Sequence, residues 1–246
     1  MTGAEISVQL YSVREAIADD LPAAIARIAQ LGFTHVEPWG FVDKVDQFRE
    51  ALTQNNLTAP SAHARLVTAE EVQPTFAAAA ALGVRTLIDP MVPAERWTTR
   101  EDVQATADRL AELAGPAAEH GLTIGYHNHS WELAEQVEGR PALEVFADLL
   151  DERVVLEVDT YWAAVGGVPA PELLARLGER VKFLHVKDGP ITDDPKAQLP
   201  AGTGAMDVPA VLAAAPDALR VIEFDAYAGD IFEGLAASLA YLRGLA

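Results

Sequence analysis

The stretch "VVLEVDTYWAAVGGVPAPELLARLGERVKFLHVK", Val154–Lys187, decides the fold. Its first run alternates Leu156 and Val158 with acidic residues, and its last run alternates Leu184 and Val186 with polar residues. Alternation with a period of two residues is typical of a β-strand, so both runs are expected to be strands. The amphipathic segment between them is expected to be helical, and it reaches the second strand through a glycine. The stretch therefore predicts one strand–helix–strand unit.

The same unit repeats along the chain. A glycine also stands between a helical segment and an apolar run in "QLGFTHV", "ALGVRTL" and "EHGLTIG". Capping boxes indicate helix starts at Thr68 with Glu71 and at Asp230 with Glu233. Eight candidate strands result: ISVQLY (6–11), FTHVEP (33–38), LTAPSAH (57–63), VRTLID (84–89), LTIGYH (122–127), VVLEVD (154–159), VKFLHVK (181–187) and LRVIEFD (219–225).

Strands that alternate with helices pair in parallel, and eight such units favour closure into a barrel. The expected fold is therefore an α/β (β/α)8 TIM barrel that spans residues 1–246 as a single domain. An open doubly wound sheet is the weaker alternative, because no glycine fingerprint of a dinucleotide site follows the first strand. The long connection at 187–207 is expected to be a substrate-covering loop.

Composition and charge exclude several classes of partner. The chain carries 18 Lys and Arg against 37 Asp and Glu, a formal net charge of -19. Such a charge repels phosphate backbones and anionic membrane surfaces, so neither nucleic acid nor a membrane is expected as a partner. The absence of cysteine excludes disulfides and thiolate zinc sites, and the first residues lack the features of a secretory signal. A cytoplasmic protein is expected, and a homo-oligomer remains open.

Ionisable residues stand at the ends of nearly all candidate strands, where the active sites of TIM barrels lie. Burying so many unpaired charges would cost several kcal/mol for each, so a shared cation is expected among them. Glu157, which precedes Asp159 on the same predicted face, is interpreted as a structural salt-bridge partner. The residues at strand ends are Glu37, His63, Asp89, His127, Asp159, His185, Lys187, Glu223 and Asp225.

Three carboxylates and one imidazole would form a mainly oxygen-donating site. Such a donor set suits Mn²⁺, Mg²⁺ or Co²⁺, with Zn²⁺ as a further candidate. A divalent ion can bind the adjacent oxygens of a hydroxy-ketone, acidify the C–H bond between them and stabilise the resulting enediolate. The pattern thus predicts proton-transfer chemistry on a sugar-like ketone.

Seven short motifs together resemble a known family: "VQLYSVR", "VEPWG", "SAH", "GYHNHSWEL", "EVDTYWA", "HVKD" and "VIEFD". Over almost the whole chain they are similar to the sugar phosphate isomerases/epimerases of the xylose isomerase-like TIM barrel superfamily. The resemblance implies metal ligands at Asp159, His185 and Glu223. With it, Glu223 is expected to be the catalytic base, and Glu132 or His185 is expected to assist the return of the proton.

The fifth strand departs from the better-known ketose epimerases of this superfamily, which place a ligand glutamate on the strand itself. Here that position falls at Tyr126 or His127. Glu132 is expected to be the fourth metal ligand if its loop folds back over the barrel mouth, with His127 as the alternative. His129 is expected to contact the substrate, or else to orient Glu132.

Several further residues near the predicted mouth are candidates for contact with a substrate. Aromatic rings there could stack on a sugar, although packing of the barrel top explains them equally well. For Lys187 the alternative is an ion pair with Asp159 or Glu223. The candidate substrate-binding residues are Glu37, Trp39, His63, His127, His129, Trp162 and Lys187.

The expected function is a metal-dependent isomerase or epimerase of carbohydrate metabolism that acts on a small-molecule sugar or keto-sugar through an enediolate. The main alternative is a lyase of the same superfamily, either an inosose dehydratase-like enzyme or one that eliminates a glycoside from a 3-keto sugar. A non-catalytic sugar-binding protein is a weaker alternative. A phosphorylated substrate is not expected, because few basic residues beyond Lys187 lie near the predicted mouth.

Overall fold

The computed structural model describes residues 5–245, and its centre is a sheet of eight parallel strands. These strands pair in chain order except between β2 and β3, and the first strand also pairs with the last. The strands are β1 (Ile6–Gln9), β2 (His35–Glu37), β3 (Ser61–His63), β4 (Thr86–Asp89), β5 (Thr123–His127), β8 (Val154–Asp159), β9 (Val181–Val186) and β10 (Leu219–Ile222).

The sheet closes on itself between β2 and β3. Two isolated parallel bridges join these segments, His35 with Thr58 and Trp39 with His63. The Val36 amide donates to the Thr58 carbonyl, and the His63 amide donates to the Pro38 carbonyl, both over 2.9 Å. The predicted (β/α)8 barrel is therefore confirmed, with all eight candidate strands in place.

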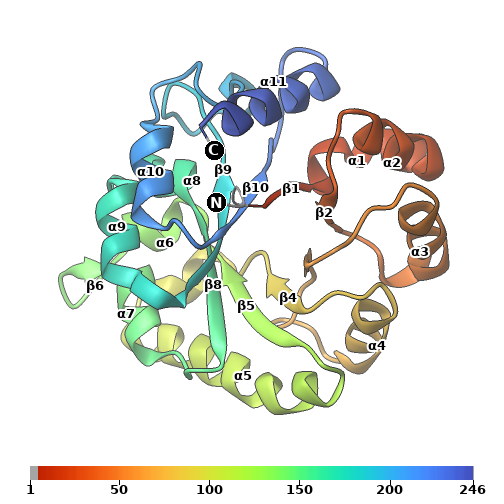
Figure 1. Cartoon of the computed structure of the whole chain (residues 1–246). Coiled ribbons are helices and arrows are strands. Elements are labelled where there is room, and N and C mark those ends of the chain that lie inside the picture. Colours follow the sequence, from red (N-terminus) through yellow and green to blue (C-terminus); the bar gives the residue numbers. More distant parts are fainter. Residues whose placement is uncertain (1–4, 246) are drawn as a thin grey trace.

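Helices surround the strands on the outside of the barrel (Figure 1). Gly83 and Gly121 lie where a helix gives way to a strand, with φ of 76° and 75°, a conformation that glycine adopts without strain. The helices are α1 (Arg14–Asp19), α2 (Leu21–Gln30), α3 (Val45–Gln54), α4 (Gln73–Ala81), α5 (Arg100–Glu119), α6 (Trp131–Ala134), α7 (Ala142–Leu149), α8 (Thr160–Val165), α9 (Ala170–Leu177), α10 (Val208–Ala214) and α11 (Ile231–Gly244).

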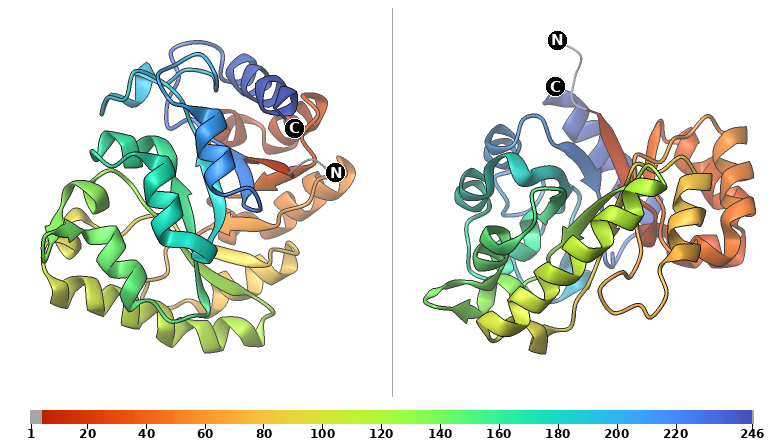
Figure 2. Two further views of the ribbon diagram at one scale, coloured as in Figure 1. Left: turned by 60° about the vertical axis from the view of Figure 1, so that its left-hand side comes forward. Right: turned by 90° about the horizontal axis from the view of Figure 1, so that it is seen from below.

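The last helix completes the outer layer beside the first ones. In both Figure 1 and the left view of Figure 2, α11 lies next to α1 and α2. The Arg27 guanidinium lies 3.8 Å from the centre of the Phe232 ring and pairs with Asp230 at 3.4 Å. Arg243 donates to the Gly32 carbonyl over 2.8 Å. These contacts hold the C-terminal helix of the chain against its N-terminal helices.

The alternation predicted for the strands is confirmed. Leu156, Val158, Leu184 and Val186 are at most 2% exposed and belong to the apolar core. Residues at the intervening positions, among them His185, are also buried, and their side chains meet one another inside the barrel. One face of each strand therefore supports the fold and the other holds polar groups.

Two local features differ from the expectations. The helix predicted to start at Thr68 begins at Gln73 instead, with a proline in its first turn, where a missing N–H leaves no hydrogen bond unmade. The connection between β5 and β8 contains a short antiparallel hairpin, β6 (Gln136–Val137) and β7 (Arg140–Pro141), that the sequence did not predict. The predicted cap at Asp230 is confirmed, because its carboxylate accepts from the first amides of α11.

Within residues 5–245, none of the helices combines the length and the apolar character that crossing a lipid bilayer would require.

Candidate active site

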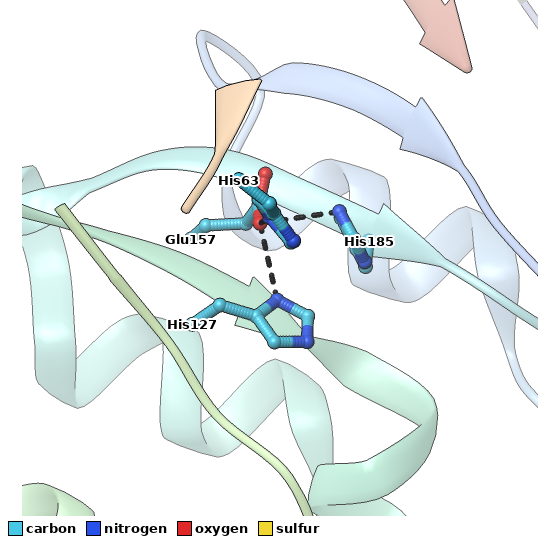
Figure 3. Close-up of side chains that lie close together, drawn as sticks. All are labelled: His63, His127, Glu157 and His185. Carbon is cyan, nitrogen blue, oxygen red and sulfur yellow. Dashed lines mark hydrogen bonds and ion pairs between the residues drawn. The ribbon is translucent and has the colours of Figure 1, made fainter. Parts of the chain in front are cut away.

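The carboxylate of Glu157 lies at the centre of a group of three histidines inside the barrel (Figure 3). One of its oxygens, Oε2, is 2.5 Å from His63 Nε2, 3.1 Å from His127 Nδ1 and 3.1 Å from His185 Nε2. The histidines come from the ends of β3, β5 and β9. Strands β5 and β9 pair with β8, which carries Glu157, whereas β3 is separated from β8 by β4 and β5. The strand order thus brings together side chains that are far apart in the sequence.

Glu37 provides a second carboxylate on the side of β2. It accepts hydrogen bonds from Gln9 Nε2 at 2.7 Å and from the Ser61 hydroxyl, and it lies 2.9 Å from His185 Nε2. Burial raises the pKa of Glu37, but the charges and hydrogen bonds of His63 and His185 outweigh burial and hold that pKa well below its usual range. Burial lowers the pKa of His63, but Glu37 and Glu157 raise it to about 10.

A second group of side chains lies beside the first and shares two of its histidines. His127, Asp159, His185 and Glu223 each offer one donor atom, and these four atoms lie within 4.8 Å of one another. His185 Nδ1 is 2.8 Å from Glu223 Oε2, and His127 Nε2 is 3.9 Å from Asp159 Oδ2. We call these four residues the ligand cluster.

The two shared histidines use opposite edges of their rings. Each points one nitrogen toward Glu157 and the other toward a carboxylate of the ligand cluster. Histidines that bind metals commonly donate their second N–H to a carboxylate in this way, which fixes the ring and its tautomer. Both groups of four residues could hold a metal ion by distance alone. The geometry favours the ligand cluster as the candidate metal site and Glu157, whose other neighbour is His63, as the residue that orients the shared rings.

Lys187 lies next to the ligand cluster and is surrounded by carboxylates. Its Nζ is 2.8 Å from Asp159, 2.6 Å from Glu223 and 2.6 Å from Asp225. Burial lowers the pKa of Lys187, but the three carboxylates raise it well above its ordinary value. Asp225 is held further by Trp162 Nε1 at 3.2 Å and by Gln198 Nε2 at 2.7 Å. The alternative considered for Lys187, an ion pair, is the arrangement that the structure shows.

Glu132 lies outside the ligand cluster. It follows a strand end at which Tyr126 points outward, toward Trp97 and Phe146. Its carboxylate accepts from the Tyr126 hydroxyl over 2.7 Å and from the His129 amide over 2.9 Å. Burial raises the pKa of Glu132 to about 8. The structure thus does not bring the expected fourth ligand to the other three, and the geometry favours the alternative, His127.

The remaining candidates divide between the cavity and the packed core. A cavity of about 580 Å³ opens at the barrel mouth. Trp162 is only 8% exposed and bonds to Asp225, whereas Trp39 is 42% exposed and meets Tyr11 edge-to-face at 5.1 Å. His129 stacks on Trp131 with the ring centres 4.4 Å apart. The cavity is lined by Tyr11, Trp39, Gly40, Phe41, Val42, His63, Ala64, Arg65, Thr75, Pro90, Met91, His127, His129, Glu223 and Asp225.

The predicted substrate-covering loop is held away from the cavity. The Asp188 carboxylate accepts from four backbone amides of the loop, those of Gly189, Gly202, Gly204 and Met206, over 2.8–3.0 Å. In the described chain, no residue of 188–207 belongs to the cavity lining. The loop reaches the site only through Gln198, which exchanges two hydrogen bonds with Asp225.

Sequence reasoning missed part of this site. Glu157 is a buried salt-bridge partner as expected, but the sequence does not indicate that its partners are three histidines of the site. The sequence analysis does not single out Tyr11, Arg65 or Met91, each of which lies two residues beyond a strand end, Tyr11 in the 3-10 turn Leu10–Val13 and the other two in loops. Their position after the first, third and fourth strands was the one available signal.

Comparison with known proteins agrees with this architecture. The family model described as xylose isomerase-like TIM barrel matches residues 25–218. A crystal structure of a sugar phosphate isomerase/epimerase from Parabacteroides distasonis superposes with a TM-score of 0.80 at 24% identity, covering 98% of this chain and 94% of the other. A crystal structure of the IolI protein with a bound zinc atom superposes with a TM-score of 0.74 at 14% identity, covering 98% and 97%.

A curated relative matches more locally. An inosose dehydratase from Geobacillus kaustophilus is 31% identical over 91 residues, which are 37% of this chain. The match spans only 29% of the length of that relative.

Proposed function

Because the chain belongs to the xylose isomerase-like TIM barrel family, we propose that it is a metal-dependent isomerase or epimerase of a keto-sugar. The reaction moves a proton at the carbon beside the carbonyl group. The observation that carries the proposal is the convergence of two imidazole nitrogens and two carboxylate oxygens within 4.8 Å beside the cavity. Relatives named as isomerases/epimerases and as a dehydratase support proton transfer of this kind.

The residues of the ligand cluster fit a divalent ion. Their four donor atoms lie close enough together to share one ion at bond lengths of about 2.0–2.3 Å. The Lys187 ammonium already lies 2.6–2.8 Å from two of these carboxylates, which shows that the position favours positive charge. Two imidazoles instead of the one expected from the sequence shift the preference from Mg²⁺ toward Mn²⁺, Co²⁺ or Zn²⁺.

An ion bound there would polarise the carbonyl and the adjacent hydroxyl of the substrate and so acidify the C–H bond between them. Glu157 would keep the His127 and His185 rings oriented. His63 and His129 line the cavity and would offer hydrogen bonds to substrate hydroxyls. Burial, followed by the charge of Lys187, lowers the pKa of His129 to about 4, so its imidazole stays neutral near pH 7.

Glu223 is the proposed base. It combines membership of the ligand cluster with a place in the cavity lining, so its carboxylate can reach both the ion and the substrate. Glu132 is not used for proton transfer in this proposal, because its oxygens are bonded to Tyr126 and His129 and it does not line the cavity. Glu132 instead holds the His129 backbone in place.

One observation favours β-elimination as a second candidate. Both carboxylates in the cavity lining, Glu223 and Asp225, follow β10, and the other ionisable groups there are imidazoles, Arg65 and the Tyr11 phenol. Epimerisation needs a proton donor and acceptor on opposite faces of the reacting carbon. Elimination needs one base that removes the proton beside the carbonyl, while the neighbouring C–O bond breaks and its oxygen takes up a proton. The lining supplies that single base directly.

Metal analysis, a Glu223→Gln variant and proton exchange in D₂O test the proposal. The purified protein is loaded with Mn²⁺, Co²⁺ or Zn²⁺ and incubated with a panel of 2-keto and 3-keto sugars. Exchange with the carbon skeleton retained supports isomerisation or epimerisation, whereas an enone product indicates elimination. We expect Glu223→Gln to abolish exchange while part of the bound metal remains. Wild-type exchange rates in this variant would remove Glu223 from the mechanism.

A further inference from the structure

The cavity extends from the ligand cluster in one direction only. Toward the loops after β2, β3 and β4 it is lined by residues such as Trp39, Arg65 and Met91. On the opposite side the mouth is filled by buried groups, since Trp162 and Gln198 both donate to Asp225. A substrate whose reacting carbon lies at Glu223 can therefore project only toward the loops that follow β2 to β4.

That side of the cavity has an aromatic and apolar wall. The Trp39 indole is 42% exposed, whereas most large apolar side chains of the described residues are buried. Its position is fixed by the edge-to-face contact with Tyr11, over whose ring the Arg14 guanidinium lies at 4.1 Å. Val42 and Met91 continue the apolar lining. A flat, exposed indole is the group on which the C–H face of a sugar or an aromatic ring packs.

Arg65 adds hydrogen-bond donors to this wall. It is the sole Lys or Arg of the cavity lining among residues 5–245, and the structure shows no hydrogen bond or ion pair for its side chain there. The charge of Lys187, by contrast, is balanced by three carboxylates. In a chain with a net charge of -19, an arginine without a carboxylate partner leaves its guanidinium donors available to a ligand.

We propose that the substrate is a glycoside, in which the keto-sugar ring lies beside the ligand cluster and a second ring lies on Trp39. Where that second ring is a sugar, Arg65 donates to its oxygen atoms. The inference rests on the proposed function and deepens it by naming the substrate class. A volume of about 580 Å³ lies within the range of roughly 300–1,000 Å³ that holds drug-sized ligands, and a single sugar would leave much of it to water.

A phosphorylated monosaccharide fits this wall less well. A phosphate dianion is usually held by several charged donors, and Arg65 stands there alone beside apolar side chains. The carboxylates of Glu223 and Asp225 in the same lining repel a dianion. The second ring can be another sugar or an aromatic aglycone. The dependence of binding on Arg65 distinguishes these two kinds of ring.

Calorimetric binding to the Mn²⁺-loaded protein tests the proposal without turnover. The probes are methyl β-glucoside, phenyl β-glucoside, cellobiose and glucose 6-phosphate, none of which carries the reactive ketone. We expect phenyl β-glucoside or cellobiose to bind about tenfold more tightly than methyl β-glucoside. Trp39→Ala should reduce that ratio to near one, while Leu199→Ala, an exposed apolar residue outside the cavity lining, should keep it.

Arg65→Gln distinguishes the two kinds of second ring. If the ring is a sugar, the substitution should weaken cellobiose binding several-fold and leave phenyl β-glucoside unaffected. The control is Arg85→Gln, an exposed residue just before β4 and so at the opposite end of the barrel from the mouth. Equal affinity for methyl and phenyl glucosides and cellobiose overturns the proposal. Tightest binding of glucose 6-phosphate, lost in Arg65→Gln, overturns it as well.

The two proposals fail independently. Absence of proton exchange on every keto-sugar, with the affinity ratios intact, contradicts only the proposed function. Exchange on small keto-sugars, with affinity ratios near one, contradicts only the glycoside proposal.

Discussion

At the scale of single residues, the structure predicts different effects on metal affinity for substitutions of His127 and of Glu132. His127 belongs to the ligand cluster, whereas the Glu132 carboxylate is bonded to Tyr126 and His129. We expect His127→Gln to weaken Mn²⁺ binding by at least about 10–100-fold, the loss typical even for residues that only support a ligand. Glu132→Gln should bind Mn²⁺ like the wild type. Metal titration followed by calorimetry measures both, and the reverse ranking would make Glu132 the ligand.

Glu132 also predicts a pH dependence of stability. Burial raises its pKa from 4.5 to about 8, so between these values the folded protein holds a proton that the unfolded chain has released. The contribution of Glu132 to the free energy of unfolding therefore falls as the pH rises from about 4.5 toward 8. A glutamine has no such proton to lose.

The comparison is made by urea unfolding at several pH values. Relative to the wild type, Glu132→Gln should gain stability steadily as the pH rises through that window. The exposed Glu138→Gln serves as the control and should follow the wild type. A constant difference between Glu132→Gln and the wild type would show that the carboxyl group is ionised throughout.

At the scale of elements, the connection after β9 depends on one carboxylate and one glycine. Asp188 accepts four backbone amides of this loop. A Cβ on Gly204 would lie 2.2 Å from Asp188 Oδ1 and 2.3 Å from the Gly189 amide nitrogen, closer than such atoms can approach. Gly204→Ala must therefore displace the carboxylate from its donors, and we expect a loss of about 1–3 kcal/mol or more.

Gly115 provides the matched control for that substitution. It lies inside α5, directly before Pro116, and a Cβ there would meet no atom within 4 Å apart from its chain neighbours. Gly115→Ala should therefore change the stability by less than about 1 kcal/mol, because the gain in helix propensity is opposed by crowding against the proline ring. Urea unfolding measures both changes. Equal effects of the two substitutions would mean that the loop after β9 tolerates displacement of Asp188.

The strands of this barrel could be predicted from the sequence, whereas the start of α4 and the fourth residue of the ligand cluster could not. Alternation in "VVLEVD" and "VKFLHVK" reflects burial of one face of each strand, a property local to the sequence. The start of α4 depends on competition between Thr68 and the proline that follows Gln73, and the proline prevails. Whether Glu132 or His127 reaches the ligand cluster depends on the outward direction of Tyr126, which the tertiary packing sets.

At the scale of the whole molecule, the strand order concentrates negative charge along the barrel axis. Glu37, Glu157, Asp159, Glu223 and Asp225 are buried or nearly so, and come from β2, β8 and the β10 end. Lys187 is the one buried lysine or arginine among residues 5–245. In the absence of an ion, His63 and His185 supply the remaining positive charge, because, despite burial, the neighbouring carboxylates raise the pKa of both imidazoles. A divalent cation would therefore stabilise the whole barrel.

We expect chelator treatment to lower the thermal midpoint and Mn²⁺ to restore it. At a free concentration one hundred times the dissociation constant, binding to the folded state alone adds about 2.7 kcal/mol. Glu132→Gln should show the full rise of the midpoint, and His127→Gln should show little or none at the same Mn²⁺ concentration. Differential scanning calorimetry measures both. Equal midpoints with chelator and with Mn²⁺ would mean that Lys187 and the imidazoles already neutralise the barrel, and the metal-dependent mechanism would then lose its structural basis.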